Sequence, residues 1–143
     1  MTGTTSTSSI ASIKPGEGYK KLIIWQNANK LRAVVWQITR RFKPIEFRRV
    51  TQMTDAARSV KQNIQEGYKS GSLGKYIQFL NICLGSLAEV KGDVDDCLND
   101  GLISQDEFED LDKLCGTTDY LISKMIKSMR QSEKSGTWKN FNA

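Results

Sequence analysis

The sequence YIQFLNICLGSLAEVKGDVDDCL, residues 76–98, decides the fold that we expect for this chain. Its apolar side chains recur at alternating steps of four and three residues, the period of an α-helix that packs along one seam. These positions are Tyr76, Leu80, Cys83, Leu87, Val90, Val94 and Leu98. Asn99, Asp100 and Gly101 follow directly and are typical of a helix end. The stretch therefore predicts one long helix with a core-facing stripe.

Three further segments show the same rhythm. We expect a first helix over residues 19–41, a second that ends near Gly67 or Lys69, and a last one that runs from Ser104 to Gln131. Their stripes are Ile24, Ala28, Leu31, Val35, Ile38 and Phe42 in the first, Val50, Met53, Ala57, Val60 and Ile64 in the second, and Phe108, Leu111, Cys115, Thr118, Ile122, Met125 and Met129 in the last.

Short connectors join these helices. Pro44 marks a turn between the first two, and Ser70 to Gly74 separate the second from the third. Ser104 and Glu107 have the spacing of a capping box, in which serine and glutamate side chains satisfy helical N–H groups. Long helices with short connectors favour antiparallel neighbours. The sequence therefore predicts an all-α, antiparallel up-down-up-down four-helix bundle.

The bundle occupies most of the 143 residues. We expect residues 1–18 to form a flexible Ser/Thr-rich tail, residues 19–131 the four-helix bundle, and residues 132–143 a flexible C-terminal tail. No run of apolar residues is long enough to span a bilayer, and no signal-peptide pattern is present. Cys83, Cys97 and Cys115 lie within helical patterns and are expected as reduced core residues. These features predict a cytoplasmic protein without membrane contact.

Two polar segments interrupt the apolar stripes. Asn63 and Glu66 lie in the second helix, and Ser86 and Glu89 lie in the third. A polar group near a core is costly unless it finds a hydrogen-bond partner. We therefore expect Asn63, Glu66, Ser86 and Glu89 to form a structural polar network between these two helices.

Histidine is absent from the chain, which excludes catalytic triads built on that residue and removes the commonest metal ligand. Adjacent carboxylates such as Asp95 and Asp96 are typical of a solvated helix face. We therefore expect no catalytic site, no metal, no cofactor and no small-molecule substrate.

Several motifs, taken in order, resemble a known family. They are Tyr19-Lys20-Lys21-Leu22-x-x-Trp25-x-x-Ala28, Phe42-x-Pro44-x-Glu46, Gln52, Ala56-Ala57, Ser59-Val60, Asn63-Ile64-x-Glu66-Gly67, Phe79-Leu80 and Gly85-Ser86-x-x-Glu89. The chain resembles the bacterial four-helix bundle proteins encoded in 23S rRNA intervening sequences. Departures from that pattern are Asp55, Arg58 and Lys61.

This resemblance implies a bundle that assembles into a ring, typically a pentamer, and that acts near RNA with no established enzymatic activity. It also implies kinship with accessory proteins of diversity-generating retroelements, which share the bundle and bind a reverse transcriptase and nucleic acid. A likeness of fold transfers little mechanism, so these implications stand as analogy.

The first helix is apolar over more of its circumference than one core-facing side requires. Leu22, Trp25 and Trp36 lie beside its stripe. Either this helix is central in its own bundle, or its second face meets another subunit. We favour the second interpretation and expect these three residues at an oligomer interface.

Charge is unevenly distributed along the chain. Residues 1–75 carry a net charge of +10, and residues 76–143 carry a net charge of −5. An antiparallel bundle would gather one group of basic residues at one end: Lys20, Lys21, Lys69, Lys75, Lys124, Lys127 and Arg130. A second group would meet the acidic residues at the other end and could be neutralised there: Arg40, Arg41, Arg48 and Arg49, with Lys43.

A concentrated basic surface attracts phosphate backbones in a salt-sensitive way. We therefore predict a non-enzymatic oligomeric scaffold that associates with nucleic acid, either RNA or a complex of RNA with a reverse transcriptase. The first group of basic residues is the preferred contact and the arginine group is the second choice. The alternative is a protein-binding adaptor for a reverse transcriptase or a ribosomal protein, with little contact to nucleic acid.

Overall fold

The computed structural model describes residues 13–136, which contain four α-helices and no β-strand. The helices are α2 (Ile23–Thr39), α3 (Phe47–Lys69), α4 (Leu73–Asn99) and α5 (Gln105–Ser135). Two 3-10 turns, η1 (Gly18–Lys21) and η2 (Pro44–Glu46), precede α2 and α3. Residues 1–12 and 137–143, which make up most of the two expected tails, lie outside this description.

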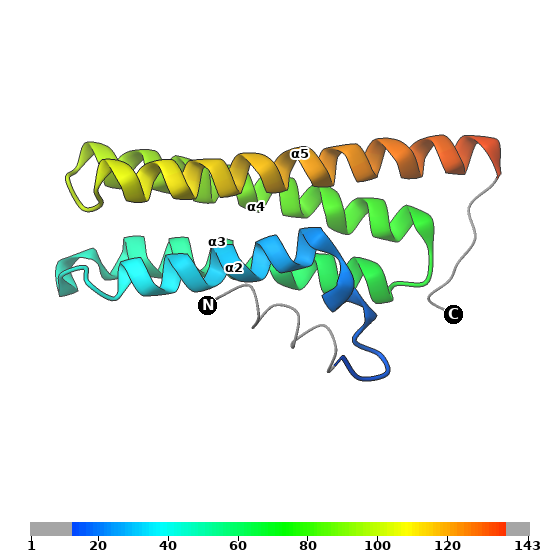
Figure 1. Ribbon diagram of the computed structural model, residues 1–143, viewed down its shortest axis with the longest axis horizontal. Coiled ribbons are helices and arrows are strands. Elements are labelled where there is room, and N and C mark those ends of the chain that lie inside the picture. Colours follow the sequence, from blue (N-terminus) through cyan, green and yellow to red (C-terminus); the bar gives the residue numbers. More distant parts are fainter. Residues whose placement is uncertain (1–12, 137–143) are drawn as a thin grey trace.

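Consecutive helices run in opposite directions along one long axis (Figure 1). Contacts between distant residues establish this order. The Trp25 indole at the start of α2 donates a hydrogen bond of 2.9 Å to the Gln65 amide oxygen near the end of α3. Arg49 at the start of α3 pairs with Asp100, which directly follows α4. The expected up-down-up-down bundle is therefore confirmed.

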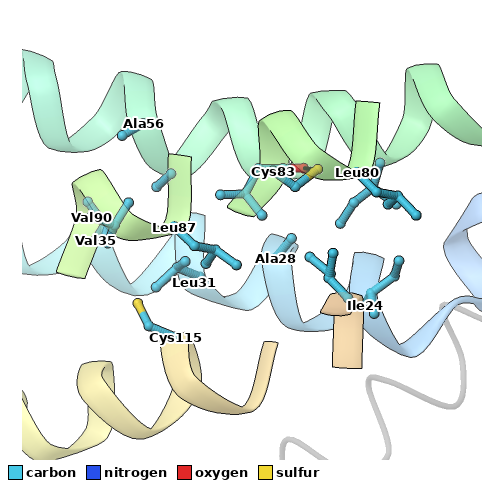
Figure 2. Close-up of a cluster of buried hydrophobic side chains, with 14 of the residues drawn as sticks. Ile24, Ala28, Leu31, Val35, Ala56, Leu80, Cys83, Leu87, Val90 and Cys115 are labelled. Carbon is cyan, nitrogen blue, oxygen red and sulfur yellow. Dashed lines mark hydrogen bonds between the residues drawn. The ribbon is translucent and has the colours of Figure 1, made fainter. Parts of the chain in front are cut away.

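Most residues of the four expected stripes are buried in the core, whereas Phe42, Val50, Leu98, Phe108 and Met125 are only partly buried. Leu31, Val60, Leu80 and Ile122, one from each helix, are completely buried. Figure 2 shows side chains of this cluster converging between the helices. The Thr118 hydroxyl in this core is satisfied within its own helix, because it donates a hydrogen bond of 2.7 Å to the carbonyl oxygen of Leu114.

Both ends of the bundle segment differ from the sequence-based boundaries. Residues 18–21 form a 3-10 turn and Leu22 is extended, so the α-helix begins at Ile23 instead of at Tyr19. Tyr19 in that turn is nevertheless buried and packs edge-on against Trp25 and Tyr68. At the other end, α5 continues to Ser135, past the expected limit at Gln131. Polar residues there show no stripe, and the helix ends only at Gly136, whose φ of 70° is left-handed.

Local start signals are confirmed at two helices. Ser104 and Glu107 form the expected capping box at α5, with hydrogen bonds in both directions. The Ser72 hydroxyl accepts a hydrogen bond of 3.2 Å from the Lys75 backbone N–H and so caps α4. These caps satisfy N–H groups that have no partner within the helix.

The three cysteines are free and buried, as expected. The Cys83 thiol donates to the carbonyl oxygen of Val60 at 3.3 Å, which joins α4 to α3. Burial raises the pKa of Cys83 and of Cys115 to about 12 and that of Cys97 to about 11. None of the helices within residues 13–136 has a stretch that is long and apolar enough to cross a bilayer.

Candidate nucleic-acid interface

One end of the bundle gathers basic side chains from four elements. We call it the basic end, and it comprises Lys20, Lys21, Lys69, Lys75, Lys124, Lys127 and Arg130. The antiparallel order brings together the elements that carry them: η1, the end of α3, the start of α4 and the last third of α5. Within the described residues, the ion pair of Lys20 with Glu17, at 3.0 Å, is the only one made by this group.

Aromatic rings support part of the basic end. The Lys69 ammonium lies 5.1 Å from the centre of the Tyr19 ring, and Tyr19 contacts Tyr68 edge-on with ring centres 6.3 Å apart. Tyr68 in turn contacts buried Tyr76 in the same manner. A side chain at Gly18 would overlap the Tyr68 hydroxyl, so this close approach depends on glycine. The charge of Lys69 therefore lies over a set of packed tyrosine rings.

The arginines at the opposite end are partly neutralised. Arg41 makes a bidentate pair with Glu107, and Arg49 contacts both Glu46 and Asp100. These contacts raise the arginine pKa values and lower the pKa of Glu107 to about 2, chiefly through the hydrogen bond from Arg41. The expected neutralisation thus occurs within one subunit. We therefore rank this end below the basic end as a phosphate-binding surface.

The expected polar network is wrong in half of its members. Ser59 is its centre, because the Ser86 hydroxyl lies 2.8 Å from the Ser59 hydroxyl and the Asn63 amide donates to Ser59 at 3.0 Å. Glu66 and Glu89 are exposed, and neither has a hydrogen bond to any residue in the range 13–136. Each lies three residues after its serine or asparagine neighbour, and that step turns it outward from the contact.

A groove of about 640 Å³ lies between α3 and α4, over the contact between Ser59 and Ser86. Its carboxylates are Asp55, Glu89, Asp93 and Asp96. Burial, then Asp96 and Glu89, raises the pKa of Asp93. Among residues 13–136, no group of three or more acidic or cysteine side chains is placed to hold a metal ion. The groove therefore presents negative charge, which disfavours phosphate on this side.

Basic residues also lie where α3 faces α2, and three of them, Arg32, Arg58 and Lys61, were not expected from the sequence as site residues. We call Lys20, Arg32, Arg58 and Lys61 the lateral basic strip. Burial lowers the pKa of the Lys61 ammonium, and the nearby charges of Arg32, Arg58 and Lys20 lower it further. In the sequence, the signal for this strip was the spacing of Arg32 in α2 and of Arg58 and Lys61 in α3, on the sides where the two helices face each other. It becomes visible only when both helices are considered together.

A comparison with known families identifies the family of the chain. The profile of one family, described as 23S rRNA-intervening sequence protein, matches residues 20–128, which is most of the chain. The chain belongs to this family. No curated protein sequence matches it. The basic end and the lateral basic strip are thus features of a member of the 23S rRNA-intervening sequence proteins.

In this intervening sequence protein, the residues expected at an oligomer interface have different environments. Trp25 is partly buried between α2 and α3, where it bonds to Gln65 and packs edge-on against Tyr19. Leu22 packs against the core and lines an apolar groove of about 390 Å³ between α2 and α5. Trp36 is 52% exposed. Their part in an oligomer stays a prediction.

Proposed function

We propose that this protein is a non-enzymatic, oligomeric scaffold that binds RNA or another nucleic acid through its basic end. One observation supports this most strongly. Lys21, Lys75, Lys127 and Arg130 come from three different elements, η1, α4 and α5, and none of them has an ion pair with a residue that the structure describes. Unpaired positive charges on one surface attract phosphate groups.

The distribution of charge indicates which surface of the protein a nucleic acid would approach. Carboxylates on the opposite end and in the groove between α3 and α4 repel a phosphate backbone. A nucleic acid would therefore approach the basic end, where nothing has to be displaced before phosphates bind. We expect the binding to depend on charge and to be largely independent of sequence.

Apolar surface supports the oligomeric part of the proposal. Ile23 is exposed beside the groove between α2 and α5, and Leu22, Leu121 and Met125 line the same groove. Contiguous apolar surface of this kind marks contact sites between proteins. It also favours the second candidate, an adaptor that binds a reverse transcriptase or a ribosomal protein and contacts little nucleic acid.

Binding of a single-stranded RNA, measured against salt concentration, tests the proposed function. We expect log affinity to fall linearly with log salt, by about 0.7 per neutralised phosphate. Lys21→Glu/Lys75→Glu/Lys127→Glu should bind much more weakly, with a slope reduced by about 2. Lys30→Glu/Lys91→Glu/Lys113→Glu changes the net charge equally at exposed positions outside both groups of basic residues and is the control.

Two results would contradict the proposal. If both triple variants lose affinity equally, net charge and not the basic end governs binding. If the folded wild type binds no RNA even at low salt, the adaptor becomes the better account of the protein.

A further inference from the structure

One side of the bundle, between α2 and α3, combines basic and aromatic residues. Trp25 identifies this side of α2, because its indole bonds to Gln65 of α3 and its ring lies 5.7 Å from the Lys61 ammonium. Arg32 and Trp36 follow Trp25 by about two and three full helical turns, so they lie on the same side. Together these positions extend the lateral basic strip along the whole of α2.

Among the described residues, three of the four charges of the strip have no ion pair, and only Lys20 is paired, with Glu17. Arg32, Arg58 and Lys61 have no ion pair within residues 13–136. The Arg32 Nε atom is buried and has no hydrogen-bond partner among the described residues. Unpaired guanidinium and ammonium groups in a partly desolvated position favour an anionic partner from solution. Phosphate is the anion that arginine binds best through two parallel hydrogen bonds.

Trp36 adds a flat apolar surface to the strip. It is 52% exposed, although it is among the largest apolar side chains of the protein. The Arg40 guanidinium lies 5.9 Å from the centre of its ring. Exposed aromatic rings and arginine planes are the groups on which unpaired bases stack. The groove between α3 and α4 holds the carboxylates of Asp55, Glu89, Asp93 and Asp96, which favours the side of α3 that faces α2 for such a ligand.

We infer that a single strand of nucleic acid follows the lateral basic strip from Lys20 to Arg40, with one of its bases stacked on Trp36. This inference rests on the proposed function and names its ligand class. The path is about 30 Å long, from the residue count of α2 and its flanks. It is continuous with the basic end through Lys20, which belongs to both surfaces. In a duplex the base faces are already stacked, so a duplex can use the charges and not Trp36.

Two substitutions separate stacking from charge. Trp36→Ala should weaken binding of a short oligouridylate about tenfold, while binding of an RNA duplex of the same length stays unchanged. Trp36→Phe should retain most of the affinity, because an aromatic ring remains. Trp36 is half exposed, so neither change should alter the helical content measured by circular dichroism.

The charges are tested with Arg58→Gln/Lys61→Gln. We expect weaker oligouridylate binding and a log–log salt slope reduced by about 1.4, which corresponds to two lost phosphate contacts. Lys30→Gln/Lys113→Gln removes the same charge at exposed sites away from the strip and should bind like the wild type. Light scattering of each variant reports whether its assembly has changed.

Each outcome decides the inference. If the strip variants bind like the wild type while the basic-end variant does not, the inference is wrong and the proposed function stands. If the wild type binds no RNA, both are wrong. If Arg58→Gln/Lys61→Gln alters the oligomeric mass and leaves RNA binding unchanged, the strip is a contact between subunits and the inference is also wrong.

Discussion

Ser59 joins α3 to α4, although it was not among the residues expected in the polar network. Its hydroxyl contacts that of Ser86, which is only 8% exposed, and accepts from Asn63. Ser59→Ala removes the partner of a buried hydroxyl, so we expect the free energy of unfolding to fall by about 1–2 kcal/mol. Chemical denaturation monitored by circular dichroism measures this change.

Two further variants make that prediction specific. In the double variant Ser59→Ala/Ser86→Ala both polar groups are gone, so much of the loss should be recovered. Glu89→Ala is the control, because Glu89 is exposed and should change stability by less than about 0.5 kcal/mol. If Glu89→Ala and Ser59→Ala lowered the free energy of unfolding equally, Glu89 would belong to the polar network, and this would contradict the structure.

The polar contact shows what spacing can and cannot predict at single residues. The stripe located the helix contact correctly and identified Asn63 and Ser86 as members. It misplaced Glu66 and Glu89, because at the margin of a stripe a rotation of about 60° decides between contact and solvent. Periodicity does not resolve that angle, since it depends on how each helix is rotated against its neighbour.

At the scale of elements, Gly67 sets how closely α3 approaches α4. A Cβ atom there would lie 2.9 Å from Tyr76 Cδ1 and 3.1 Å from the Phe79 Cβ. Alanine normally stabilises a helix interior by up to about 1 kcal/mol relative to glycine. At this position we expect the steric overlap to prevail, so Gly67→Ala should lower the melting temperature.

Gly116→Ala provides the matched comparison in α5. Nothing lies within 4 Å of the added Cβ at that position, so alanine should raise the melting temperature there. If both alanine variants are stabilised, the contact between Gly67 and Tyr76 is looser than the structure shows. The sequence suggested Gly67 only as a helix end, because close packing against another helix leaves no local signal.

Helix ends were predictable where a side chain supplies the cap. The capping box at Ser104 depends on residues three apart and needs no tertiary contact. The start of α2 was placed four residues too early, because Tyr19 is buried from a 3-10 turn and not from the α-helix. An apolar stripe indicates which side chains are buried, and both an α-helix and a 3-10 turn can bury a side chain.

At the scale of the molecule, ion pairs between helix ends should make stability depend on pH. The pKa of Glu107 falls from 4.5 to about 2 in the folded protein. Its charged form therefore favours folding above about pH 4.5, and this contribution is lost as the pH falls towards 2. Glu107→Gln keeps a capping side chain and removes the charge. We expect its denaturation midpoint to be lower than that of the wild type at neutral pH.

The difference between the two proteins should shrink as the pH approaches 2. Glu109→Gln serves as the control, because Glu109 has no arginine partner within residues 13–136. A constant difference between wild type and Glu107→Gln from pH 6 to pH 2 would show that the pair with Arg41 does not carry the effect.

The charge pattern of the whole molecule could be predicted only in part. Counting charges along the chain located the basic end and anticipated the neutralised arginines. It missed the lateral basic strip, because Arg58 follows Asp55 by only three residues and their charges cancel in a linear count. Arg58 and Lys61 form a strip only because Arg32 of α2 and Lys20 of η1 lie near them in the bundle, which a linear count does not register.

The three buried thiols have a practical consequence for spectroscopy. Their pKa values of about 11 and 12 leave almost no thiolate at neutral pH, and their burial shields them from reagents. A maleimide dye should therefore react selectively with a cysteine introduced at an exposed position such as Lys30 or Lys113. Donor and acceptor fluorophores can be attached to the otherwise native protein, and the distance between neighbouring copies can be followed by energy transfer.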